Sequence, residues 1–267
     1  MPKVRPCALA GSFYPSSPEV LEATIRDLLS KVKGPFSKKS PKAFIVPHAG
    51  YIYSGPIAAT AYAAMAKDAS QIRKVVMLGP AHREYVEGLA LPDADWLDTP
   101  LGPVEVDEEA RTQISDLPQV KVSGIAHSEE HSLEVQLPFL KEILREFKIL
   151  PLLVGKASPE DIDLVLQRVW NGNETLILVS SDLSHYLPYE KAFRLDRESA
   201  QAVLRLEFLK QNQACGASPI NGFLKTARRY ALEPHLLDLR NSGDTAGGKN
   251  RVVGYGAFAF VEGRSSG

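Results

Sequence analysis

Short apolar runs and longer amphipathic stretches alternate along the whole chain. The apolar runs are bounded by polar or turn residues, and they predict strands over residues 42–47, 74–80, 148–155, 174–182, 235–241 and 252–261. Several runs are continuous rather than alternating with polar residues, which is typical of strands buried on both faces. We therefore expect a sheet that is covered by helices on each side.

The stretches between these strands carry helical signals. They predict helices over residues 18–32, 55–65, 107–115, 132–147, 159–170, 188–210 and 217–230. The motif SPE occurs at 17–19 and again at 158–160, and it places a serine N-cap before a proline at the first helical position. Pro138 falls inside the helix predicted over 132–147, so we expect a break or kink there.

This order of elements predicts a single domain that spans residues 1–267. Strand–helix alternation over the full length favours an α/β fold with a central mixed, largely parallel sheet and helices on both faces. We find no linker that would divide it. The polar tail at 262–267 is expected to be disordered.

Composition narrows the class of protein. The net charge is −1, so no electrostatic field favours nucleic acid or an anionic membrane. No apolar run approaches the roughly 20 residues that cross a bilayer, and the N-terminus lacks the long apolar core of a secretory signal. The only cysteines are Cys7 and Cys215, too few for a disulfide framework. A reducing cytoplasm is the expected compartment.

Histidines follow three of the predicted strands. His48 comes after AFIVP, His82 after VVMLGP, and His185 a few residues after LILVSSD. In open α/β sheets, ligands bind beyond the carboxyl ends of the strands, where the loops converge. A single histidine after a strand is usually only a loop residue, but three equivalent placements favour a shared site.

Other polar residues are candidates to accompany these histidines. Asp182 precedes His185 by three residues, and Asp244 lies in a loop of small residues, NSGDTAGG. Asp244 is equally compatible with a flexible turn. His127 and His131 are four residues apart, a spacing that can place two ligands on one helix face. The residues between them do not form HExxH, so we interpret this segment as site-lining or structural.

Several ordered motifs resemble those of one family. They are GSFYP (11–15), PHAGYIYSG (47–55), LGPAH (78–82), EEHSLEVQLPFL (129–140), VSSDLSHY (179–186) and the small residues around Asp244. Together they resemble the Memo family, whose bacterial and archaeal members are the B component of the AmmeMemoRadiSam system. The resemblance runs from about residue 5 to about residue 260. It implies a fold similar to that of class III extradiol dioxygenases, which are non-haem iron enzymes.

The resemblance also implies roles for particular residues. His48 and His82 match the family's metal-binding histidines, and His185 matches a pocket histidine with an acid–base role. The third ligand is a cysteine in animal members. Our alignment places Asp244 there and leaves no such role for Cys7 or Cys215. Two histidines and a carboxylate match the facial triad of non-haem Fe(II) oxygenases, so Fe(II) is the favoured divalent metal, with Zn or Cu as alternatives.

Neighbouring residues receive supporting roles in this hypothesis. Asp182 would orient His185, contact the substrate, or only cap the following helix. Glu130 and His131 would line the rim behind the ligands. Tyr51 and Tyr53 would form the pocket wall.

Three functions remain open at this stage. The first is a metal-dependent, dioxygenase-like oxidoreductase acting on an unidentified small molecule. The second is a metal- or peptide-binding adaptor without turnover, because fold does not determine function. The third is a metal-assisted hydrolase. The name of the system also implies a functional link to a radical-SAM protein and to the Amme component.

Overall fold

Four parallel strands form the centre of the molecule. The computed structural model describes residues 2–33 and 40–263. The central strands are β2 (Pro41–Val46), β3 (Lys74–Pro80), β8 (Lys148–Val154) and β9 (Thr175–Ser180). They lie in the order β8-β3-β9-β2, and each neighbouring pair is parallel. Nearly all of their residues are buried, as the continuous apolar runs predicted.

Antiparallel and short strands extend this centre in both directions. Beyond β2 lie β12 (Val252–Glu262), β11 (Leu232–Asn241) and β10 (His185–Leu187). Beyond β8 lie β6 (Val104–Val106), β5 (Trp96–Leu97), β1 (Val4–Arg5), β4 (Leu89–Leu91) and β7 (Val120–Val122). The long strand β12 is antiparallel to β2, β10 and β11, so the sheet is mixed.

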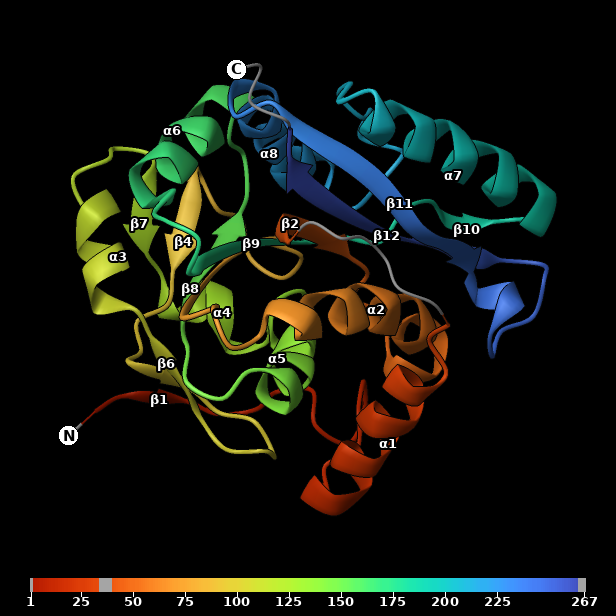
Figure 1. The fold of residues 1–267 in the computed structure, drawn as a ribbon, viewed down its shortest axis with the longest axis horizontal. Coiled ribbons are helices and arrows are strands. Elements are labelled where there is room, and N and C mark those ends of the chain that lie inside the picture. The colour runs from red at the N-terminus through yellow and green to blue at the C-terminus, as the bar shows by residue number, and fades with distance from the viewer. Residues whose placement is uncertain (1, 34–39, 264–267) are drawn as a thin grey trace.

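Helices cover both faces of the sheet. They are α1 (Pro18–Ser30), α2 (Tyr51–Met65), α3 (Glu108–Ile114), α4 (Gly124–Ser128), α5 (Leu137–Ile143), α6 (Pro159–Val169), α7 (Tyr189–Leu204) and α8 (Ala217–Arg229). Figure 1 shows α1, α2 and α5 on one side of the central strands and α6, α7 and α8 on the other. Each side has its own apolar cluster. The predicted α/β class and its two helical layers are confirmed.

Both predicted serine caps are present. The Ser17 hydroxyl accepts a hydrogen bond from the Val20 amide at the start of α1. At the start of α6, Ser158 and Asp161 form a reciprocal capping box. These caps satisfy amide groups that have no partner within the helix, so local sequence determines where both helices begin.

The structure corrects several predicted boundaries. Residues 132–147 do not form one kinked helix, because a short turn at Glu134–Gln136 precedes α5. Pro138 lies in the first turn of α5, where its missing N–H costs no intrahelical hydrogen bond. Helix α2 begins at Tyr51 rather than at 55, and α7 ends at Leu204 rather than at 210.

The end of the chain is ordered further than predicted. Glu262 is the last residue of β12, and the Gly263 amide donates to the Ala231 carbonyl at 3.2 Å. The disordered tail predicted from 262 therefore does not include these two residues. The rest of that tail, 264–267, lies outside the described residues.

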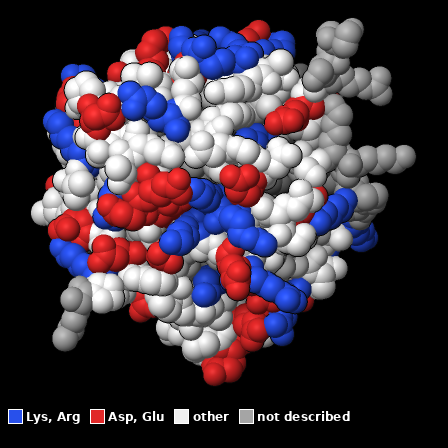
Figure 2. Space-filling view, turned by 60° about the vertical axis from the view of Figure 1, so that its left-hand side comes forward, with Lys and Arg blue, Asp and Glu red and all other residues white. Residues whose placement is uncertain are grey.

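Charges of both signs are mixed on the surface. Exposed pairs include Lys148 with Glu105 and Lys225 with Glu160. The face shown in Figure 2 likewise carries Lys and Arg side chains among Asp and Glu side chains. Such a mixture does not create the one-signed field that attracts polyanions. Within the described part of the chain, no helix combines the length and apolar character that a membrane crossing requires.

Candidate metal centre

The carboxyl ends of the central strands bring two of the predicted histidines together. His48 follows β2, and His82 follows β3. Strand β9 lies between these two strands and is parallel to both. The two loops therefore emerge at the same edge of the sheet, as predicted from the strand ends. The rings of His48 and His82 are 5.3 Å apart, centroid to centroid.

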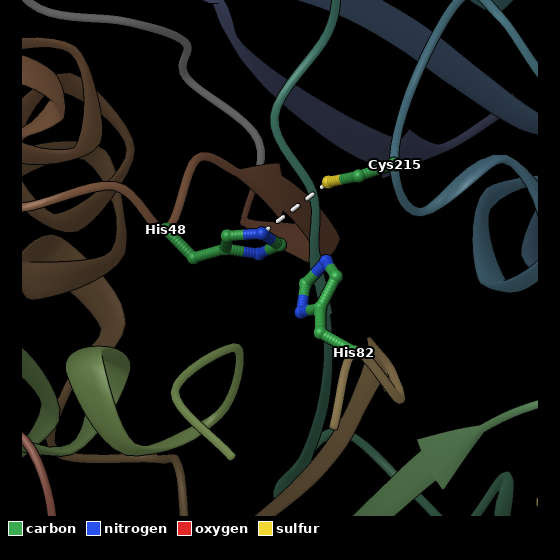
Figure 3. A group of neighbouring side chains, drawn as sticks. All are labelled: His48, His82 and Cys215. Atoms are coloured by element: carbon green, nitrogen blue, oxygen red, sulfur yellow. Dashed lines mark hydrogen bonds between the residues drawn. The ribbon is translucent and has the colours of Figure 1, made fainter. Parts of the chain in front are cut away.

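Cys215 completes a cluster with these histidines. It lies two residues before α8, and its Sγ is 3.3 Å from Nε2 of His48. One donor atom from each of His48, His82 and Cys215 lies within 4.8 Å of the other two. Figure 3 shows the sulfur and the two rings converging on one space from three different segments.

Asp244 lies apart from this cluster. Among residues 2–33 and 40–263, it belongs to no cluster of donor atoms that includes His48 and His82. One of its carboxylate oxygens accepts from the Tyr189 hydroxyl at 2.6 Å, and the other accepts from the Asn241 amide at 2.9 Å. Asp244 therefore closes a capping box at the end of β11. The structure thus brings Cys215, and not Asp244, into one cluster with His48 and His82.

His48 is buried and held at two points. Its main-chain N–H donates to Oδ1 of Asp182 at 2.8 Å, and its Nδ1 lies 3.0 Å from the Ser180 hydroxyl. Burial, together with the positive charge that His131 and His82 would carry, lowers the pKa of His48 well below its usual value. The imidazole is therefore neutral near pH 7, which is the form that binds metals.

Glu130 organises the other side of the cluster. Its carboxylate accepts hydrogen bonds from the main-chain amides of His82, His131 and Ser132. It also lies 3.0 Å from Nδ1 of His82. Burial alone would raise the pKa of Glu130, but hydrogen bonds from His131 and His82 outweigh it and hold the pKa well below its usual value. The ionised carboxylate accepts the Nδ1 proton of His82 and leaves Nε2 for a ligand.

His131 lies against both candidate ligands. Its ring stacks on His82 at 4.6 Å and meets His48 edge-on at 5.2 Å. Phe13 covers it from another direction at 5.0 Å. Glu130 and His131 therefore both contact His82. His127, by contrast, belongs to α4 and directs its ring to the Ala90 carbonyl, so the two histidines do not share a helix face.

His185 and Asp182 each hydrogen-bond to a main-chain group and not to each other. Nδ1 of His185 is 2.8 Å from the Leu183 carbonyl, which can only accept. The Nδ1–H of His185 therefore donates to this carbonyl. Asp182 orients the main chain of His48 rather than the ring of His185. Burial raises the pKa of Asp182, against the lowering effect of the His48 amide and of charge on His185.

The thiol of Cys215 is protonated in this environment. Burial, reinforced by the negative charge of Asp182, raises the pKa of Cys215 to about 12. Its main-chain N–H donates to the Asp182 carbonyl at 3.3 Å. Gly216 follows, and a side chain there would come within 2.7 Å of the Ser181 side chain. The chain can pass this close to β9 only because residue 216 is glycine.

The tyrosines of the PHAGYIYSG motif pack in and against the apolar core. Tyr51 is buried in the apolar core, where its ring packs 5.0 Å from Phe139 and its hydroxyl donates to the Val135 carbonyl. The side chain of Tyr51 is therefore held within the core. Tyr53 is half-buried and packs against the same apolar cluster.

A surface groove reaches the sulfur. It has a volume of about 410 Å³, and Cys215, Ala81, Tyr85, Lys156 and Gln211 contribute to its lining. A larger cavity of about 950 Å³ is lined by α1, α2, β11 and Asp244, and by none of the clustered donors. Of these two, the smaller groove is the one that contacts a clustered donor.

Sequence reasoning missed Cys215 and Ser180. Cys215 follows no strand, so the strand-end pattern that identified the histidines gave no signal for it. Ser180 is the last residue of β9 and the first of the SSD motif, so the available signal was a hydroxyl at the carboxyl end of a buried strand.

The fold and the cluster define an α/β protein with a histidine–cysteine centre at the carboxyl edge of its parallel strands. A family model described as Memo-like protein matches residues 5–259. A MEMO1 family protein of Aquifex aeolicus is 39% identical over 272 residues, 97% of this chain and 100% of the relative. One of Saccharolobus solfataricus is 35% identical, with 95% and 98% of the two chains covered. One of Sulfolobus acidocaldarius is 33% identical, with 96% and 99% covered. The chain belongs to the Memo family, as the motifs predicted.

Proposed function

We propose that this protein binds one transition metal ion through His48, His82 and Cys215. The observation that carries the proposal is the convergence of two imidazole nitrogens and a sulfur within 4.8 Å of one another. A cysteine third ligand also agrees with the resemblance to animal members of the family. The proposed donor set replaces the facial triad that the sequence suggested.

The spacing of the donors suits a metal. Zinc-like bonds of roughly 2.0–2.1 Å to nitrogen and 2.3 Å to sulfur, at a tetrahedral angle, place the two donors about 3.6 Å apart. The Sγ–Nε2 separation of 3.3 Å is close to this value. Imidazole and thiolate donors suit iron, copper and zinc rather than magnesium or calcium. We favour Fe(II), with Cu and Zn as the alternatives that the donor chemistry allows.

The surrounding residues support a role in oxidoreductase chemistry on a small molecule. A bound redox metal would supply electron transfer and polarisation of a bound oxygen atom. Within the protein, the Leu183 carbonyl holds Nδ1 of His185, and the ring would accept and return a proton through its other nitrogen. Asp182 holds the His48 main chain, and Glu130 holds His82. The groove that reaches Cys215 provides the route for the substrate.

A thiolate nucleophile without a metal is the competing use of a cysteine and a histidine in contact. That chemistry needs a lowered thiol pKa and a protonated imidazole. Here burial, with the charge of Asp182, raises the pKa of Cys215, and burial lowers the pKa of His48. Both groups are therefore neutral near pH 7, and the metal interpretation is favoured.

Substitution of the donors tests the proposal. Protein purified without added metal, and protein loaded anaerobically with Fe(II), would be analysed for bound metal as wild type, Cys215→Ser and Asp244→Asn. We expect about one metal ion per chain in the wild type and in Asp244→Asn, and a large loss in Cys215→Ser. The Co(II)-loaded wild type should show a sulfur-to-cobalt charge-transfer band that Cys215→Ser lacks.

The outcomes separate the three functions. Oxygen uptake with a small-molecule reductant, lost in His185→Ala while the metal stays bound, supports an oxidoreductase. Bound zinc without oxygen chemistry favours a metal-assisted hydrolase. Failure of every tested metal to bind would contradict both enzymes and favour the adaptor.

A further inference from the structure

We infer that Ser180 is a positioning residue that fixes which ring nitrogen of His48 carries the proton. The inference rests on the proposed function in one respect: the proton on Nδ1 would serve to keep Nε2 free for a metal. The arrangement itself follows from hydrogen bonds among buried groups. Ser180, the last residue of strand β9, would then belong to the site as a residue that contacts a donor ring without binding the metal.

The hydrogen bonds of Gln136 determine the orientation of its side-chain amide. Its Nε2 lies 2.9 Å from the Pro47 carbonyl, which can only accept, so the amide nitrogen must face that carbonyl. The Tyr62 hydroxyl donates to Oε1 on the other side at 2.7 Å. The same Nε2 lies 2.9 Å from the Ser180 hydroxyl. Gln136 therefore donates to Ser180 and cannot accept from it.

The hydrogen of the Ser180 hydroxyl is also used in a hydrogen bond to another group. The hydroxyl forms a short hydrogen bond to the main-chain carbonyl of Ser132, which accepts only. A hydroxyl has one hydrogen and two lone pairs. The hydrogen goes to Ser132, and Gln136 uses one lone pair. What remains for His48 is a lone pair.

His48 must therefore donate. Its Nδ1 is 3.0 Å from the Ser180 oxygen, so the single proton of the neutral ring lies on Nδ1. Nε2 then has its lone pair directed toward the sulfur of Cys215, 3.3 Å away. Because Ser180 and Gln136 are both almost fully buried, water does not offer an alternative partner. In metal sites, the group that holds the non-ligating nitrogen sets the tautomer in the same way.

The test reads the tautomer in metal-free protein. Long-range ¹H–¹⁵N spectra distinguish a ring protonated on Nδ1 from one protonated on Nε2, and the His48 signals are assigned by their loss in His48→Gln. The wild type should show the proton on Nδ1. In Ser180→Ala the tautomer should shift toward Nε2, and Co(II) affinity should fall by about 10–100-fold. Ser180→Thr, which keeps a hydroxyl, should restore both properties.

Ser132→Ala is the matched control. It removes a buried hydroxyl that donates to the Pro80 carbonyl, but it keeps the main-chain carbonyl that accepts from Ser180. It should therefore leave the His48 tautomer and the Co(II) affinity unchanged. A general loosening of the site would instead affect Ser180→Ala and Ser132→Ala alike, and would overturn the inference.

Two further results would overturn it: a wild-type proton on Nε2, or a Ser180→Ala protein with wild-type tautomer and affinity. The wild-type spectrum decides the first point even if Ser180→Ala does not fold. Failure of the proposed metal function is distinguishable. In that case Co(II) binds to no variant, while the tautomer still responds to Ser180→Ala and supports the inference.

Discussion

At the scale of single residues, Glu130 holds several parts of the site in place through one carboxylate. One buried carboxylate accepts three main-chain amides and faces Nδ1 of His82. Its charge is retained because these donors outweigh the cost of burial. A neutral amide side chain of the same shape has only one accepting oxygen and could not accept from all these donors at once.

Glu130→Gln should therefore weaken the site without removing a ligand. The amide keeps the shape but replaces one accepting oxygen with a donor, which cannot serve the clustered N–H groups. We expect Co(II) affinity to fall by about 10–100-fold and the free energy of unfolding to fall by about 1–3 kcal/mol. Calorimetric titration and urea unfolding measure the two effects. Wild-type affinity in a folded Glu130→Gln protein would contradict this role.

Asp196 gives a pH-dependent prediction at the same scale. This carboxyl accepts from the Ser184 amide at 2.9 Å, and burial raises its pKa from 3.8 to about 6. The folded state therefore binds the proton more tightly than the unfolded state. The resulting stability is fully present below pH 3.8 and is lost as pH rises through about 6.

Asp196→Asn removes this titration. Relative to the variant, the wild type should lose up to about 3 kcal/mol of unfolding free energy between pH 4 and pH 8. Urea unfolding of both proteins at pH 4.5, 6 and 8 measures the difference. A difference that stays constant across this range would show that Asp196 does not titrate in it.

At the scale of elements, helix α8 determines where Cys215 lies. Gly222 in α8 packs against α6, and a side chain there would come within 2.3 Å of Cβ of Ile162. The close approach of the two helices therefore depends on the absence of a side chain. Because Cys215 lies just before α8, the position of the sulfur depends on the same packing.

Gly222→Ala should accordingly destabilise the protein by about 1–3 kcal/mol, although alanine favours helices. Gly248→Ala is the matched control, because no atom lies within 4 Å of a side chain at that loop position. Its effect should stay within about 0.5 kcal/mol. Urea unfolding compares them, and equal stabilities would mean that α6 and α8 can separate at little cost.

The elements also show what the sequence could predict. Strands ending at 46 and 80 could be identified from their apolar runs, and their parallel pairing brought His48 and His82 to one edge. Cys215 could not be placed in this way, because its position depends on the packing of α8 against the sheet and not on local pattern. The structure places Asp244 apart from the two histidines, since a loop of small residues indicates a turn but not which cavity the turn faces.

At the scale of the whole molecule, metal binding should stabilise the fold. A ligand that binds only the folded state adds about 2.7 kcal/mol when present at 100 times its dissociation constant. For a chain of this length, that is an increase of about 5–10 °C in the melting temperature. Calorimetric scans with and without Co(II) measure it. Cys215→Ser should show little increase, and an equal increase in both proteins would place the metal elsewhere.

The three donors are synthesised at different times during translation, because they lie far apart in the chain. His48 and Cys215 are separated by 167 residues, and β12, the last strand, pairs directly with β2, one of the first. A nascent chain therefore exposes both histidines to the metals of the cell long before the sulfur leaves the ribosome. Two imidazoles alone select metals differently from two imidazoles and a thiolate. In the proposed site, the sulfur can therefore contribute to the choice of metal only after translation has reached the last fifth of the chain.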